Sequence, residues 1–83
     1  MNFRDAIFLK LLYSNNAKTK LTSMTLKDII SQSNKHLVIS GSLRVRVANM
    51  IEDGYIAEGL SYGHSKSYYI TPKGINWLNE MSE

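Results

Sequence analysis

The chain has 83 residues, a formal net charge of +3 and a hydrophobic fraction of 43%. This length allows one domain over residues 1–83 with a small core, and the hydrophobic fraction is too high for a disordered tail. No apolar run approaches the roughly 20 residues that a membrane span needs, the first residues lack the order of a signal peptide, and the absence of cysteine excludes disulfides and thiolate chemistry. We therefore expect a cytoplasmic protein without a membrane segment.

Positive charge is concentrated in the middle of the chain. Between residues 18 and 46, six cations stand against a single anion, Asp28. Such a segment favours an anionic partner, because neutralising phosphates releases counterions. At so low a net charge, a surface charged only for solubility is the competing explanation. The six cations are Lys18, Lys20, Lys27, Lys35, Arg44 and Arg46.

The first helix is predicted over residues 2–13. Phe3, Ile7 and Leu11 lie four residues apart, and other apolar residues widen this stripe. So wide an apolar surface on a short helix indicates burial on more than one side, against the core and against a partner subunit. The polar residues 14–16 then favour a turn.

A second, shorter helix is predicted from residue 26 to about residue 32. Thr25 and Asp28 form a start that is similar to a capping box. Before it, residues 17–23 are basic and polar, and residues 21–24 favour one short strand. After it, a polar turn is expected over residues 31–35, and residues 36–39 follow no clear pattern.

A third helix, over residues 41–53, is the element around which we interpret the chain. Ser40 or Ser42 can cap its start, and Gly54 can end it in the left-handed conformation that glycine adopts readily. Its inner face is apolar, and its opposite face carries small, basic and amide side chains, with Arg44 on the flank. The inner face consists of Leu43, Val47, Met50 and Ile51, and the opposite face of Ser42, Val45, Arg46 and Asn49.

The polar face of this helix suits the major groove of DNA. Arginine can contact guanine O6 and N7, asparagine can contact adenine N6 and N7, and a valine methyl can touch the thymine methyl. Glu52 and Asp53 would repel phosphate, so contact is expected mainly in the N-terminal half of the helix. The alternative is an ordinary amphipathic helix whose polar face is solvated.

A β-hairpin and a last helix follow. Residues 55–60 and 67–70 are predicted strands, and the polar residues 62–66 form the turn between them. Thr71 then caps a helix in which Pro72 takes the first position. The predicted fold is therefore α+β and mostly α. It has the order of a winged helix-turn-helix: a three-helix core, a β-hairpin wing over residues 60–68 and a C-terminal helix.

Two family resemblances support this prediction. The segments Glu52-Asp53-Gly54-Tyr55-Ile56 and Tyr68-Tyr69-Ile70-Thr71-Pro72-Lys73-Gly74 resemble the wing of MarR/PadR-type bacterial regulators, with isoleucine in place of the usual leucine. Residues 63–71 are also similar to the wings of small DNA-binding adaptors in tubulin-type partition systems of plasmids and phages. Both resemblances imply a DNA-binding protein with a winged helix.

Further contacts with DNA are expected outside the third helix. Thr25 and Lys27, with the loop residues Lys18 and Lys20, are candidates for phosphate contact at a helix start. Capping and solubility explain them equally well. His64 and Lys66 are expected at the wing tip, where they contact the minor groove or a phosphate, or serve only the geometry of the turn.

A homodimer is expected from the apolar residues near the two ends of the chain. Phe3, Trp77 and Met81 are the candidates for its interface, and the alternative is that they close one small core. An enzyme is not expected, because His36 and His64 have no cysteine or carboxylate pair nearby and no phosphate-binding glycine loop or metal-ligand spacing occurs. We expect no cofactor, metal or small-molecule ligand.

Three functions are compatible with these features. The first is sequence-specific binding of double-stranded DNA by a small, dimeric transcriptional regulator. The second is a winged-helix module that binds protein, since fold alone does not fix function. The third is a plasmid or phage partition or replication adaptor, which binds DNA repeats and a motor protein.

Overall fold

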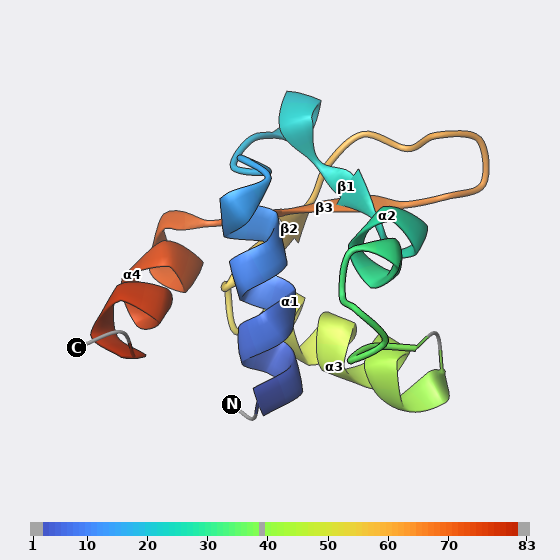
Figure 1. Ribbon diagram of the computed structural model, residues 1–83. Helices are drawn as coiled ribbons and strands as arrows, with labels where there is room; N and C mark the ends of the chain where they lie inside the picture. The colour runs from blue at the N-terminus through green and yellow to red at the C-terminus, as the bar shows by residue number, and fades with distance from the viewer. Residues whose placement is uncertain (1–2, 39, 82–83) are drawn as a thin grey trace.

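The N-terminal helix packs against a small antiparallel sheet, as the computed structural model of residues 3–38 and 40–81 shows (Figure 1). Figure 1 shows this helix, α1, crossing in front of β3, with α4 on one side and α2 and α3 on the other. The elements in chain order are α1 (Phe3–Ser14), the 3-10 helix η1 (Lys20–Thr22), β1 (Met24–Thr25), α2 (Leu26–Ser31), α3 (Gly41–Glu52), β2 (Ile56–Glu58), β3 (Ser67–Ile70) and α4 (Pro72–Met81).

The four predicted helices are present, with small shifts at their ends. Asn2, the predicted first residue of the first helix, lies outside the described residues, as does Ile39 at the end of the unassigned segment 36–39. In the part of the chain that the structure describes, no helix has the length and apolar character to cross a membrane.

The sheet has the order β1-β3-β2, and both pairings are antiparallel. Ile56 pairs with Ile70 and Met24 pairs with Tyr68, so β3 lies between two short edge strands. The loop over residues 59–66 projects to the right in Figure 1 and is closed by a bridge between Tyr62 and Ser65. We call residues 59–66 the hairpin loop.

The strand predicted over residues 21–24 is displaced toward the C-terminus. Residues 20–22 form η1 instead, because the Thr19 side chain accepts a hydrogen bond from the Thr22 backbone N–H and starts a helical turn there. Only Met24 and Thr25 then pair with β3. Ser23, which follows η1, is linked to β3, since its hydroxyl lies 2.6 Å from that of Ser67.

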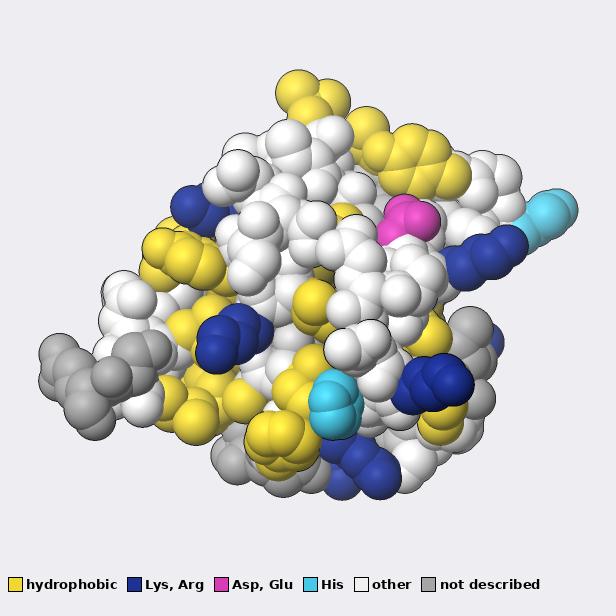
Figure 2. Space-filling view, viewed as in Figure 1, with side chains coloured by type: hydrophobic (Ala, Val, Ile, Leu, Met, Phe, Trp, Pro, Cys, Tyr) yellow, Lys and Arg dark blue, Asp and Glu magenta, His cyan; other side chains and the backbone are white. Residues whose placement is uncertain are grey.

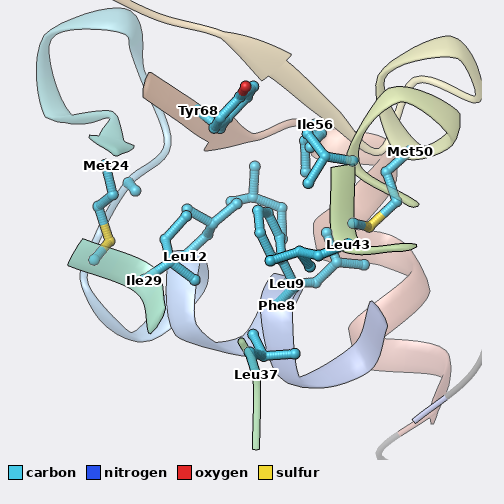
Figure 3. Packing of buried hydrophobic residues seen from close by; sticks show 13 residues of the cluster. Phe8, Leu9, Leu12, Met24, Ile29, Leu37, Leu43, Met50, Ile56 and Tyr68 are labelled. Carbon is cyan, nitrogen blue, oxygen red and sulfur yellow. The ribbon is translucent and has the colours of Figure 1, made fainter. Parts of the chain in front are cut away.

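The core lies between α1, α3 and the sheet (Figure 3). Phe8, Leu9 and Leu12 of α1 are fully buried and belong to the same core cluster as Ile56 and Ile70 of the sheet. Burial of an aliphatic or aromatic side chain of this size contributes roughly 1.5–3 kcal/mol, so these side chains fix the position of α1. The core face of α3 closes the other side with Leu43, Val47 and Met50.

Helix α4 is held close to the sheet by Thr71 and Gly74. The Thr71 hydroxyl donates to the Gly54 carbonyl oxygen and accepts from the Gly74 N–H at 3.3 Å. A Cβ atom at Gly74 would lie 2.3 Å from the Tyr55 carbonyl oxygen, so only glycine allows this approach. Trp77 then packs edge-on against the Tyr55 ring, with centroids 6.3 Å apart.

Candidate nucleic-acid interface

Helix α3 begins and ends as its sequence predicts. The Leu43 N–H donates to the Ser40 hydroxyl at 3.1 Å, so Ser40 rather than Ser42 caps the helix. Gly54 follows the helix end with φ = 84°, in the left-handed region. Val45 and Asn49 lie on its exposed side, and 61% of the Val45 surface is accessible. Both residues are therefore free to meet a partner.

A groove of about 570 Å³ runs between α3, the start of α2 and the hairpin loop. We call it the hairpin groove. Five of the nine predicted DNA-binding residues line it, which brings together side chains from three separate segments of the chain. These five are Thr25, Lys27, Arg44, His64 and Lys66. Figure 2 shows basic and histidine side chains on the side of the molecule where α3 and the hairpin loop lie.

The hairpin groove is mainly cationic. Lys27, Arg44 and Lys66 contribute three positive charges, and Glu58 is the acidic residue among the described lining residues. Glu58 Oε1 lies 3.7 Å from Lys66 Nζ, and both side chains are more than half exposed, so this pair is weak. The groove therefore keeps a net positive charge that favours an anionic ligand.

Tyr68 forms part of the wall of the hairpin groove and stays protonated. Burial raises the pKa of the Tyr68 hydroxyl, the nearby Glu58 carboxylate raises it further, and Arg44 acts in the opposite direction. Thr25 has a structural role here as well, because its hydroxyl accepts a hydrogen bond from the Asp28 N–H at 3.2 Å and caps α2.

The opposite flank of α3 carries Ser42 and Arg46. These two residues line a second pocket, of about 240 Å³, together with side chains from α1 and from the loop that precedes α3. Arg46 Nη1 lies 3.6 Å from Asp5 Oδ1 of α1, and the Arg46 side chain is only 31% exposed. The structure thus places Arg46 on the flank of α3, whereas the helical pattern predicted it on the outward face.

The ionisable residues of this second pocket that were not predicted from the sequence as site residues are Arg4, Lys35 and His36. No local pattern identifies them, because the pocket depends on the contact of α1 with α3, which lie about 40 positions apart in the chain. Among the described residues, no group of three or more histidine and acidic side chains is arranged to hold a metal ion.

The three predicted dimer residues lie in different environments. Phe3 is 71% exposed and meets His36 edge-on, so it does not belong to the core. Met81 is 56% exposed at the end of α4. Trp77 is partly buried against the core. Phe3 and Met81 therefore remain available to a partner.

Over the residues that the structure describes, these features define a small α+β protein of four α-helices and a three-stranded antiparallel sheet, with a basic groove beside α3. No protein-family model matches the chain. The chain is 30% identical over 81 residues to the DNA-binding protein TubR of Clostridium botulinum C phage, and the match covers 98% of this chain and 96% of the relative. The chain belongs to the TubR family.

The fold is also that of a solved TubR structure. TubR from Bacillus megaterium pBM400 superimposes with a TM-score of 0.82 over 100% of this chain and 88% of that one, at 17% sequence identity.

Proposed function

We propose that this protein is a DNA-binding adaptor of the partition type that recognises double-stranded DNA through a winged helix-turn-helix. In this proposal α3 is the recognition helix and the hairpin loop is the wing. The family relationship supports DNA binding, and the gathering of five predicted contact residues in the hairpin groove is the observation that carries the proposal. The protein then acts in the cytoplasm, where its DNA is.

The proposed contacts divide between positioning and recognition. Val45 and Asn49 on the exposed face of α3 reach base edges in the major groove. Lys27, Arg44 and Lys66 in the hairpin groove contact the sugar-phosphate backbone and fix the register. Phosphate contacts supply most of the affinity, and base contacts supply the sequence preference.

An adaptor is proposed in preference to a transcriptional regulator. The relative carried by a phage and the similarity of residues 63–71 to the wings of partition adaptors both support this choice. A homodimer is part of the proposal, because the apolar side chains of Phe3 and Met81 stay exposed. Two copies would present two recognition helices to one site.

The test is a salt titration of duplex binding, followed by fluorescence anisotropy. Changing Lys66 to alanine should weaken binding on all sequences and reduce the slope of log K against log salt by about 1, because one phosphate contact is lost. Lys10→Ala is the matched control, since Lys10 is an exposed lysine of α1 outside both pockets. Equal slopes for the two variants would reject the hairpin groove as the site.

A further inference from the structure

The hairpin loop contains a β-bulge between the sheet and its tip. Near the tip, Tyr62 and Ser65 form a bridge and exchange two backbone hydrogen bonds, of 2.8 and 3.0 Å. Closer to the sheet, Leu60 and Ser61 on the outgoing side stand opposite Lys66 alone. Such an extra residue interrupts the ladder of backbone hydrogen bonds, bends the strand and changes the direction of nearby side chains. The direction of the loop therefore depends on what holds the bulge.

A buried serine holds this bulge. Ser67, the first residue of β3, is 1% exposed, and its hydroxyl donates to the carbonyl oxygen of Leu60 in the bulge. The backbone carbonyl oxygen of Ser67 accepts from the Gly59 N–H at 2.9 Å. The side chain thus adds a hydrogen bond one residue beyond this backbone bond, where the ladder is interrupted. Ser67 therefore ties the bulge to the start of β3.

A second serine, in the residue before β1, supports Ser67. The Ser23 hydroxyl lies 2.6 Å from the Ser67 hydroxyl and 2.8 Å from the Lys20 carbonyl oxygen. Because a hydroxyl donates a single proton and that of Ser67 goes to Leu60, Ser67 is the acceptor in the contact between the two serines. The chain of hydrogen bonds runs from Ser23 through Ser67 to the bulge.

The hairpin passes close to Ser23 because Gly59 has no side chain. A Cβ atom at Gly59 would collide with the Ser23 hydroxyl and would lie 3.1 Å from the Lys20 carbonyl oxygen. The 3-10 helix η1, which Lys20 begins, therefore lies directly against the start of the hairpin loop (Figure 1). The base of the loop is thus held on one side by β3, through Ser67, and on the other by η1.

From these contacts we infer that Ser67 is a positioning residue for DNA binding, whose hydroxyl holds the bulge and so places His64 and Lys66 against DNA. His64 lies beyond the bulge and Lys66 opposite it, and both are exposed, so their placement depends on the loop backbone rather than on packing in the core. This inference rests on the proposed function and deepens it. It names a buried residue, itself out of reach of DNA, that the hairpin contact requires.

The first test is a double-mutant cycle on DNA affinity. Ser67→Ala should lower affinity about five- to tenfold at roughly 0.1 M salt and reduce the salt slope by up to about 1, because a phosphate contact is lost. In a background that carries His64→Ala and Lys66→Ala, the same substitution should lower affinity less than about twofold, because the side chains that Ser67 places are already absent. Ser61→Ala, at an exposed serine of the same loop, is the matched control and should bind like the unmodified protein.

A second measurement follows the loop without DNA. Backbone amide order parameters of residues 60–66 should fall toward the flexible range, below about 0.6, in Ser67→Ala and stay unchanged in Ser61→Ala. A thermal melt checks that both variants are folded. Ser23→Ala removes the supporting hydrogen bond and leaves the bond from Ser67 to Leu60, so it should show both effects at a smaller size. This variant tests the inference in the same way where Ser67→Ala does not fold.

Two results would overturn the inference. One is a Ser67→Ala variant that binds DNA as Ser61→Ala does, and the other is a loss of affinity that is equal with and without His64 and Lys66, since a merely structural role would act on every contact alike. The hairpin-groove proposal survives both results as long as Lys66→Ala alone is impaired. An unimpaired Lys66→Ala variant would instead reject the hairpin groove itself, and with it this role of Ser67.

Discussion

Arg44 and Arg46 of α3 differ in their exposure and in their contacts. Arg44 is exposed in the hairpin groove, whereas Arg46 is half-buried and lies 3.6 Å from the Asp5 carboxylate. A phosphate that approaches Arg46 competes with this carboxylate. Asp5 therefore weakens the attraction of the second pocket, which Arg46 lines, for anions.

Changing Asp5 to asparagine should strengthen DNA binding. The substitution keeps the shape of the side chain and removes the negative charge that pairs with Arg46 of the second pocket. A partly exposed ion pair is worth about 0.2–1 kcal/mol, so the expected gain is roughly 1.5- to 5-fold in affinity at low salt. Anisotropy titrations measure the gain, and a thermal melt checks that the variant is folded. A folded variant with unchanged or weaker affinity would contradict this role for Asp5.

The Tyr68 hydroxyl predicts how stability changes at alkaline pH. Burial and Glu58 raise its pKa in the folded state, so the unfolded chain loses this proton first as the pH rises. Stability is unaffected below the unfolded pKa of about 10 and falls as the pH rises from there toward the folded pKa. Tyr68→Phe should melt at a temperature that falls less steeply between about pH 9 and about pH 11. Parallel curves for the two proteins would contradict this assignment.

Periodicity predicted which residues of α3 face the core but not how far the core reaches around the helix. Leu43, Val47 and Met50 are buried as the pattern indicates. The pattern also placed Arg46 and Asn49 together on the outward face. Of these two residues, Asn49 is exposed and Arg46 is partly buried. The position of Arg46 depends on Asp5, whose contact with α3 is a tertiary feature that no local spacing contains.

At the scale of elements, local signals located the helix starts at which a cap was predicted. The caps at Ser40, Thr25 and Thr71 lie at helix starts, as predicted. The strand before α2 was misplaced, because its pairing with β3 crosses more than 40 residues and the Thr19 cap competes for the same segment. The pairing partner, rather than local propensity, decides where so short a strand lies.

The close packing of α4 on the sheet predicts a selective effect of one glycine. Gly74→Ala would place a Cβ atom 2.3 Å from the Tyr55 carbonyl oxygen, so α4 must move outward. We expect a loss of about 1–3 kcal/mol in the free energy of unfolding, which lowers the melting temperature by roughly 4–8 °C per kcal/mol in a domain of this size. Chemical denaturation with a thermal melt measures the loss.

Gly41→Ala is the matched control for this experiment. Gly41 is also helical and has nothing within 4 Å of an added Cβ atom. Alanine there should be neutral or should stabilise the protein by about 0.4–1 kcal/mol, since it restricts the unfolded chain. Similar losses for both variants would show that the contact with Tyr55 is not the cause.

At the scale of the whole molecule, the length of the protein determines how closely neighbouring copies can lie along DNA. The longest extent is 38 Å, which corresponds to about 11 base pairs at roughly 3.4 Å per pair. One helical turn of DNA is about 10–10.5 base pairs, or about 34–36 Å. Copies bound to repeats one turn apart would lie on the same side of the duplex, and with their long axes along the DNA they would be close enough to touch.

Binding to repeated sites should consequently be cooperative and depend on spacing. On duplexes with increasing numbers of repeats one helical turn apart, affinity per site should rise with repeat number, because each new copy contacts a bound neighbour as well as DNA. Insertion of half a turn between repeats should remove this gain, since neighbours then lie on opposite sides of the duplex. Mobility-shift titrations with sedimentation velocity measure affinity and stoichiometry together. A transcriptional regulator that reads one palindrome would instead saturate at a fixed stoichiometry, whatever the number or spacing of additional repeats.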